Sequence, residues 1–247
     1  MTSQFEGKVA LVTGAGSGLG EAIAMKLAHE GATVIVADVS GKQDAVAAAL
    51  GSPAVARTLD VSSQQSVLEL ETWITETYGG LDVLANNAGI GGPQALTHEY
   101  PIEAFDAVMA VNVRGAYMVL QAGLRLMLAS GGGAVVNTAS IGGFRATPYS
   151  SGYITSKGAS VMMTRTAALE YAQQGIRVNA VAPGVTRTPI LDGSDPDVLH
   201  MLESQVPQGR LGEPSDVANV VAFLADDALA PHITGQIWAI DGGRSAG

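Results

Sequence analysis

The chain has 247 residues, of which 47% are hydrophobic and 15% charged, so it can bury a large core and is not a mainly disordered protein. Its 13 Lys and Arg against 23 Asp and Glu give a net charge of −10 at pH 7, which argues against nucleic-acid and anionic-membrane partners. The absence of Cys excludes disulfides, thiolate metal sites and Cys nucleophiles. No apolar run reaches the roughly 18 residues of a membrane-spanning helix, and no secretory signal is visible. We therefore expect a soluble, cytoplasmic protein with one domain, 1–247.

Short apolar runs rich in Val, Ile and Ala alternate with longer helical patterns along the chain. We predict strands at 8–13, 33–38, 54–60, 82–86, 134–140, 177–183 and 236–241. Helices are predicted at 18–30, 42–50, 63–78, 101–129, 152–173 and 214–225. Nearly continuous apolar strands separated by helices are typical of a parallel sheet covered on both faces. The sequence thus predicts an α/β fold of Rossmann type, with a doubly wound parallel seven-stranded sheet.

A glycine-rich turn, TGAGSGLG over Thr13 to Gly20, lies between the first predicted strand and the first helix. Such a turn lets backbone N–H groups and a helix N-terminus approach a pyrophosphate. The second strand ends in Asp38, at about the 20-residue distance expected of an acid that accepts hydrogen bonds from the adenosine ribose. A carboxylate there repels a 2′-phosphate, which favours NAD over NADP. The alternatives are a tight turn without a ligand and an acid that caps the following turn.

Tyr153 and Lys157 are four residues apart in a predicted helix, so their side chains share one face. A neighbouring ammonium and an oxidised nicotinamide would each stabilise the phenolate, which suits proton exchange with a hydroxyl or carbonyl oxygen. Ser140 ends the fifth predicted strand, at the edge where such sheets bind ligands, and Asn112 lies within the long helix 101–129. Taken singly, these residues also fit an amphipathic helix surface, a cap and a satisfied core amide.

Together these motifs resemble the short-chain dehydrogenase/reductase family over nearly the whole chain. The matching features are the Thr13–Gly20 motif, Asp60, Asn86-Asn87-Ala88-Gly89, Asn112, Ser140, Tyr153-x-x-x-Lys157, and Pro183-Gly184 followed by Thr186 and Thr188. The resemblance implies that Tyr153 is the catalytic acid/base and that Ser140 orients the substrate. It also implies that Lys157 binds the nicotinamide ribose and lowers the Tyr153 pKa, and that Asn112 supports the proton relay.

The same resemblance implies a set of residues that contact the cofactor. These are Gly14, Ser17, Gly18, Leu19, Gly20, Asp38, Asp60, Val61, Asn87, Ala88, Gly89, Tyr153, Lys157, Pro183, Gly184, Thr186 and Thr188.

The segment 186–210 breaks the strand and helix rhythm with several Pro and Gly residues. We expect it to be a mobile substrate lid with short helical pieces, the alternative being a solvated loop. By their position after the matched motifs, the residues expected to face the substrate are Gly91, Gly92, Ser140, Ile141, Gly142, Ser150, Tyr153, Val185, Leu191 and Met201. This lining is small and apolar, with Arg145 near its rim as the one cation. It favours an uncharged hydrophobic secondary alcohol or its ketone.

The four His residues are dispersed without zinc-site spacing, and no Ser stands in G-x-S-x-G, so neither a metal site nor a serine hydrolase is expected. The helices 101–129 and 152–173 are apolar on more than one face, which favours the homotetramer common in the family over a deep monomeric core. The sequence predicts an NAD-dependent oxidoreductase acting on a small molecule. The alternatives are a 3-oxoacyl-carrier-protein reductase that uses NADPH and, more remotely, a non-catalytic dinucleotide-binding regulatory protein.

Overall fold

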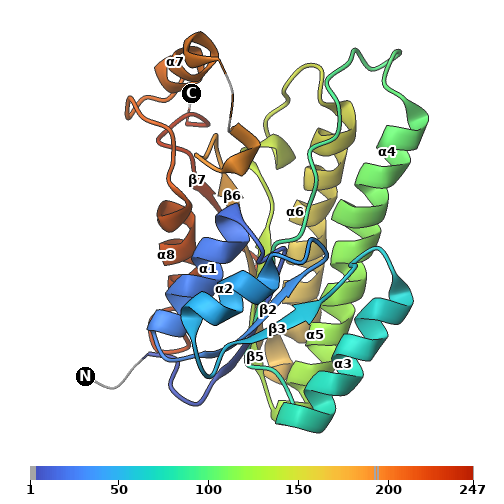
Figure 1. Ribbon diagram of the computed structural model, residues 1–247, viewed down its shortest axis with the longest axis vertical. Helices are drawn as coiled ribbons and strands as arrows, with labels where there is room; N and C mark the ends of the chain where they lie inside the picture. The colour runs from blue at the N-terminus through green and yellow to red at the C-terminus, as the bar shows by residue number, and fades with distance from the viewer. Residues whose placement is uncertain (1–3, 192, 194, 247) are drawn as a thin grey trace.

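One parallel sheet organises the protein, whose computed structural model describes residues 4–191, 193 and 195–246. Its seven strands are β1 (Val9–Thr13), β2 (Thr33–Asp38), β3 (Val55–Thr58), β4 (Val83–Asn86), β5 (Gly133–Thr138), β6 (Ile176–Pro183) and β7 (Ile237–Ile240). They are all parallel, in the order β3-β2-β1-β4-β5-β6-β7 (Figure 1). The predicted doubly wound seven-stranded sheet is confirmed.

Helices cover both faces of this sheet (Figure 1). One layer consists of α1 (Gly18–His29), α2 (Gln43–Leu50) and α8 (Pro214–Ala225). The other contains α3 (Gln64–Tyr78), α4 (Ile102–Met109), α5 (Ala116–Ser130) and α6 (Ser151–Tyr171). Successive β1 residues point to opposite faces, so Ala10 and Val12 pack in the core with α1 and α8, while Leu11 packs in the core with α3, α5 and α6. The short helix α7 (Pro196–Ser204) lies at the carboxyl end of the strands, within the segment predicted to carry short helical pieces.

The predicted uninterrupted helix at 101–129 is instead two α-helices joined by a π-helical segment, Ala110–Gly115. Asn112 is buried within this segment. A Cβ at Gly115 would lie 2.9 Å from the carbonyl oxygen of Val61, so the helix passes this loop closely. Single wide turns of this kind are frequent at functional sites. Two strand ends also differ from the prediction, since Asp60 and Ser140 lie two residues beyond the ends of β3 and β5.

The stretch Ile102–Ser130 is also the one helical run, among the described residues, that is long and apolar enough by length and composition to cross a membrane. Part of it is buried against the sheet, with Val119, Leu120 and Met127 in the core. It is therefore explained as a core helix.

The sheet order places a crevice at the carboxyl end of β1 and β4. The chain leaves β1 toward β2 on one side and continues from β4 toward β5 on the other, so the connections diverge at this point. Ligands of open α/β sheets bind outside the carboxyl ends of the strands at such a switch point.

Candidate active site

A cavity of 560 Å³ opens at this switch point. It is walled by the glycine turn after β1, by Asp38, by the loop after β4, by the start of α6 and by the loop after β6. The predicted site residues that line it are Gly14, Ser17, Gly18, Leu19, Gly20, Asp38, Asn87, Ala88, Gly89, Gly91, Gly92, Ser140, Ser150, Tyr153, Lys157, Pro183, Gly184, Val185, Thr186, Thr188 and Leu191. With the residues that follow β5, among them Ser140, six separate parts of the sequence therefore meet in one cavity.

The glycine turn is compact enough for the backbone to approach a ligand. Gly14 and Gly18 adopt φ angles of +64° and +59°, in the left-handed region that favours glycine. A Cβ at Gly20 would lie 2.0 Å from the carbonyl oxygen of Gly14, so a side chain does not fit there. Ser17 precedes α1 without a side-chain capping bond. The turn leaves the helix N-terminus open to the cavity, as pyrophosphate binding requires.

Hydrogen bonds fix this turn to the loop after β4. The Thr13 hydroxyl accepts hydrogen bonds from the backbone N–H groups of Asn87 and Ala88, at 3.0 and 3.1 Å. In return, the Asn87 amide nitrogen donates to the Thr13 carbonyl at 3.0 Å. The two loops therefore form one rigid floor beneath the cavity.

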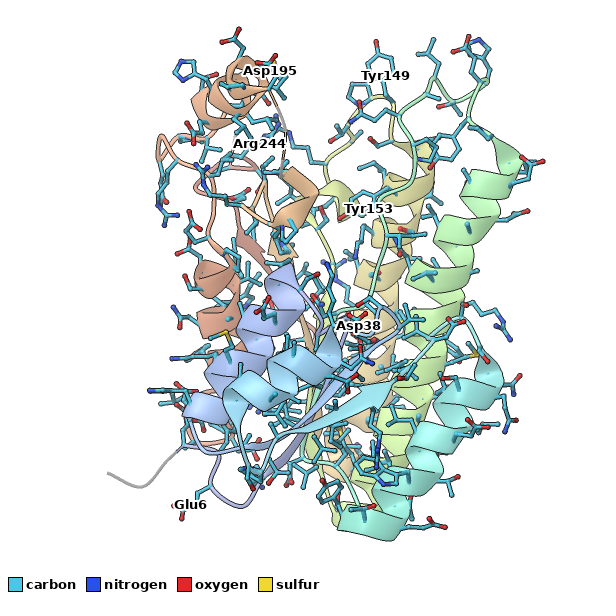
Figure 2. All side chains as sticks on the ribbon, in the orientation of Figure 1. Glu6, Asp38, Tyr149, Tyr153, Asp195 and Arg244 are labelled. Atoms are coloured by element: carbon cyan, nitrogen blue, oxygen red, sulfur yellow. The ribbon has the colours of Figure 1, made fainter. Side chains whose placement is uncertain are left out.

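Asp38 stands at the end of β2, beside the glycine turn (Figure 2). Its carboxylate accepts hydrogen bonds from the backbone N–H groups of Gly16 at 2.9 Å and Ser40 at 2.8 Å. Burial opposes ionisation of the Asp38 carboxyl, but these hydrogen bonds hold its pKa below the ordinary value. A fixed negative charge therefore lies on the cavity wall beside the glycine turn.

Ser140, Tyr153 and Lys157 come together at the other part of the cavity. Lys157 Nζ lies 5.5 Å from the centre of the Tyr153 ring and donates a hydrogen bond to the Thr138 carbonyl at 2.7 Å. Burial raises the pKa of the Tyr153 hydroxyl, and a hydrogen bond with the Ser140 side chain lowers it only in part. The Tyr153 pKa therefore stays above its ordinary value, so the lowering expected from the sequence is not present in the free protein.

Lys157 is almost completely buried, and this burial lowers its pKa from 10.5 to about 8. It is the only Lys or Arg among the described residues that line the cavity. At neutral pH it keeps its proton. The cavity therefore contains one ammonium group, beside the tyrosine that would exchange a proton with the substrate.

Asn112 does not line the cavity but lies directly behind it. Its side-chain oxygen accepts from Ile90 N–H, and its side-chain nitrogen donates to the Ile90 carbonyl, both at 2.8 Å. The same nitrogen donates to the Ser156 hydroxyl at 3.0 Å, and Ser156 donates to the Tyr153 carbonyl at 2.7 Å. Asn112 and Ser156 thus join the cavity loop to the helical turn that carries Tyr153, and Ser156 had no signal of its own in the sequence.

Five further predicted site residues lie outside the cavity lining. The Gly142 N–H donates to the Ser140 hydroxyl, so Gly142 supports the site from behind. Met201 is half exposed on α7. The others are Asp60, Val61 and Ile141. Ile141 and Gly142 lie in the 3-10 turn after Ser140, and Met201 lies on α7, so these three residues predicted to face the substrate are not part of the cavity wall.

The lining also includes residues that the motifs did not indicate. These are Ile90, Gln94, Thr138, Ala139 and Pro189. Each lies within a few residues of a motif, before it for Thr138 and Ala139 and after it for the others, and residue type gives no signal for them.

Comparison with known proteins identifies the family of the chain. The family described as enoyl-(acyl carrier protein) reductase matches residues 14–245. The chain is 43% identical to cis-4-hydroxycyclohexanecarboxylate dehydrogenase of Sinomonas cyclohexanicum, over 100% of both chains. It is 39% identical to the 3-oxoacyl-[acyl-carrier-protein] reductase of Thermotoga maritima, over 97% of this chain and 98% of the other. The crystal structure of levodione reductase superposes with a TM-score of 0.92 at 38% identity, covering 98% of this chain and 99% of the other. Full-length relatives, a shared fold and the Tyr153-Lys157 site establish that the chain belongs to the short-chain dehydrogenase/reductase family, whose members are NAD(P)-dependent oxidoreductases.

Proposed function

We propose that this protein is an NAD-dependent dehydrogenase that interconverts an uncharged hydrophobic secondary alcohol, carried on a ring, and its ketone. The observation that carries the proposal is the meeting of Ser140, Tyr153 and Lys157 in a cavity that Asp38 also lines. The fixed carboxylate of Asp38 supports NAD over NADP, because it would repel a 2′-phosphate. The relative named for a hydroxycyclohexane carboxylate supports a ring as the carrier of the reacting carbon.

The bound cofactor supplies the hydride acceptor or donor, and the side chains of this protein handle the proton. In alcohol oxidation the Tyr153 oxygen takes the proton of the substrate hydroxyl, while Ser140 donates a hydrogen bond to the same substrate oxygen. In ketone reduction Tyr153 returns the proton to the carbonyl oxygen. Because burial raises the Tyr153 pKa, the free protein holds this proton at neutral pH and is ready to act as an acid. Oxidation needs the phenolate, so its rate should rise with pH.

Lys157 and Asn112 act on Tyr153 from two sides. The Lys157 ammonium is proposed to bind a ribose hydroxyl and to favour the phenolate by its charge once the cofactor is bound. Asn112 holds the Tyr153 turn through Ser156 and is proposed to support the proton relay.

The segment 186–210 is proposed to act as a lid over the substrate. It brings Thr188, Pro189 and Leu191 to the cavity wall, and α7 follows them along the chain. The structure does not describe residues 192 and 194 of this segment.

We also propose that the protein is a cytoplasmic homotetramer. Apolar side chains of α5 and α6 remain exposed in the single chain, including Tyr117, Met162 and Leu169. Leu120 and Val161, on the same two helices, are buried in the chain itself and are not part of these exposed faces. Sedimentation-equilibrium analysis tests the proposal, and a monomer at micromolar concentration would contradict it.

Initial rates for a panel of cyclic and open-chain secondary alcohols and ketones, with NAD(H) and NADP(H) in parallel, test the proposed reaction. Turnover with NAD(H) that disappears in Tyr153→Phe is expected. Turnover of a 3-oxoacyl carrier substrate with NADPH would instead favour the acyl-carrier reductase, a reading that the relative from Thermotoga maritima supports. Cofactor binding without any turnover would indicate a regulatory protein.

A further inference from the structure

One tyrosine side chain lies between the loop after β4 and the first turn of α6. Tyr100 precedes α4, which packs beside α6 (Figure 1). A Cβ at Gly152 would lie 2.8 Å from the Tyr100 hydroxyl oxygen and 3.0 Å from the ring carbon that carries it. A Cβ at Gly92 would overlap the same oxygen. The end of the Tyr100 side chain therefore occupies the space that side chains on both glycines would need.

These two glycines belong to the two sides of the candidate active site. Gly92 lines the cavity, and Gly152 directly precedes Tyr153 in α6. Tyr100 is not among the lining residues and its hydroxyl oxygen is buried, so this oxygen lies behind the wall that Gly92 forms. The buried Val108 of α4 would meet a Cβ at Gly92 at 2.9 Å, so the space behind this wall is filled by α4 as well. The position of the wall relative to Tyr153 therefore depends on how Tyr100 packs.

Stability does not account for the Tyr100 hydroxyl. The oxygen is buried and has no hydrogen-bond partner among the described residues. Burying a hydroxyl without a partner destabilises a fold, whereas Phe would bury the same ring without this cost. The oxygen makes the side chain one atom longer, and this atom is the one that lies against both Gly92 and Gly152. Its effect in the folded protein is therefore to keep the two backbone segments apart.

We infer that Tyr100 is a positioning residue, whose hydroxyl sets the distance between the cavity wall at Gly92 and the helical turn that carries Tyr153. This distance limits the size of the ring that can bring its reacting carbon to Tyr153. The inference rests on the proposed function, because it concerns a substrate held between this wall and Tyr153. A misplacement of about 1 Å can lower a rate about 100-fold, so a shift of a few tenths of an ångström should lower it about tenfold.

The main test adds the missing methyl group on the helix side. Gly152→Ala must displace either Tyr100 or the turn that carries Tyr153, because its Cβ has no room. With a ring alcohol and NAD⁺, kcat should fall about tenfold, while the Kd for NAD⁺ should stay within about twofold. Tyr100→Phe in the same chain frees the space of the hydroxyl, so the double variant should recover kcat to within about threefold of wild type.

The matched control for this test is Gly158→Ala on the same helix. A Cβ at Gly158 would have its nearest neighbour, the Gly143 carbonyl oxygen, at 3.9 Å, which is an ordinary contact. This variant should therefore keep kcat within about twofold of wild type.

A second test uses Tyr100→Phe alone. Removing the oxygen lets the wall at Gly92 retreat, so bulkier rings should fit better. The kcat/KM for 4-tert-butylcyclohexanol, divided by that for cyclohexanol, should rise at least about threefold, chiefly through KM for the bulkier alcohol. Tyr78→Phe, at the end of α3 and outside the cavity lining, should keep this size ratio.

The outcomes separate this inference from the proposed function. If ring alcohols are oxidised in a Tyr153-dependent manner, the positioning role is refuted and the reaction stands when Gly152→Ala keeps kcat, when Tyr100→Phe does not restore it, or when the size ratio of Tyr100→Phe equals that of wild type. If no ring alcohol or ketone is turned over, the proposed function fails and the inference fails with it. Thermal unfolding shows whether each variant is folded, and if Gly152→Ala is not, the size ratio of Tyr100→Phe decides.

Discussion

Replacing Lys157 with Met should stabilise the free protein while abolishing its turnover. Burial lowers the Lys157 pKa from 10.5 to about 8, so the folded state releases this proton at a lower pH than the unfolded state. At about 1.36 kcal/mol for each pKa unit, the buried ammonium costs the folded state about 3 kcal/mol below pH 8. Met removes this cost, but the Thr138 carbonyl then loses its donor, at a cost of about 1–3 kcal/mol. At pH 7 we therefore expect a net gain of about 1 kcal/mol.

The pH dependence is the sharper signature of the buried ammonium. Between pH 8 and 10.5 the unfolded chain holds this proton and the folded protein does not, so wild-type stability rises with pH in that window. Urea unfolding of the cofactor-free protein from pH 7 to 10 should show the stability of Lys157→Met relative to wild type falling by about 2–3 kcal/mol, so that the variant becomes the less stable protein at pH 10. Lys42→Met, which replaces an exposed lysine, should keep a constant difference from wild type. A constant difference for Lys157→Met as well would refute the reasoning.

Three further predictions concern single side chains. Asp38→Ala should reduce the preference for NAD over NADP, measured as the ratio of the two kcat/KM values, by at least about tenfold, since no carboxylate then repels a 2′-phosphate. An unchanged ratio would show that another residue selects the cofactor. Ser156→Ala leaves a buried donor of Asn112 without a partner and should lower kcat about tenfold at unchanged cofactor affinity. The control Ser160→Ala, one turn further along α6, should change kcat less than about twofold. Equal losses of kcat in the two variants would count against a positioning role for Ser156. The buried Tyr100 hydroxyl has no partner among the described residues, so Tyr100→Phe should leave the free energy of unfolding equal or up to about 1 kcal/mol higher, and a clear destabilisation in urea would contradict this.

Features encoded by local patterns could be predicted from the sequence, whereas those that depend on tertiary packing could not. The glycine turn and Asp38 follow from residue type and spacing, and Tyr153 and Lys157 follow from helical periodicity. The π-helical segment around Asn112 inserts a wide turn that the apolar pattern of the helix does not reveal. The lowered pKa of Lys157 arises from the elements packed around it. Similarly, Gln94 lines the cavity although no motif contains it.

The floor that joins Thr13 to Asn87 limits how this protein can be redesigned. An engineer who exchanges the glycine turn for that of an NADP-dependent relative would treat residues 13–20 as an independent cassette. Yet the Asn87 side-chain nitrogen donates to the Thr13 carbonyl, and the Thr138 hydroxyl donates to the Asn87 side-chain oxygen at 3.1 Å. The turn also passes close to the loop after β4, since a Cβ at Gly14 would lie 2.9 Å from Ala88 Cα. The transplantable unit therefore includes the ends of β4 and β5 as well as the turn. Chimaeras that respect this boundary should fold, and those cut at the turn alone should lose cofactor affinity before any change of specificity can be seen.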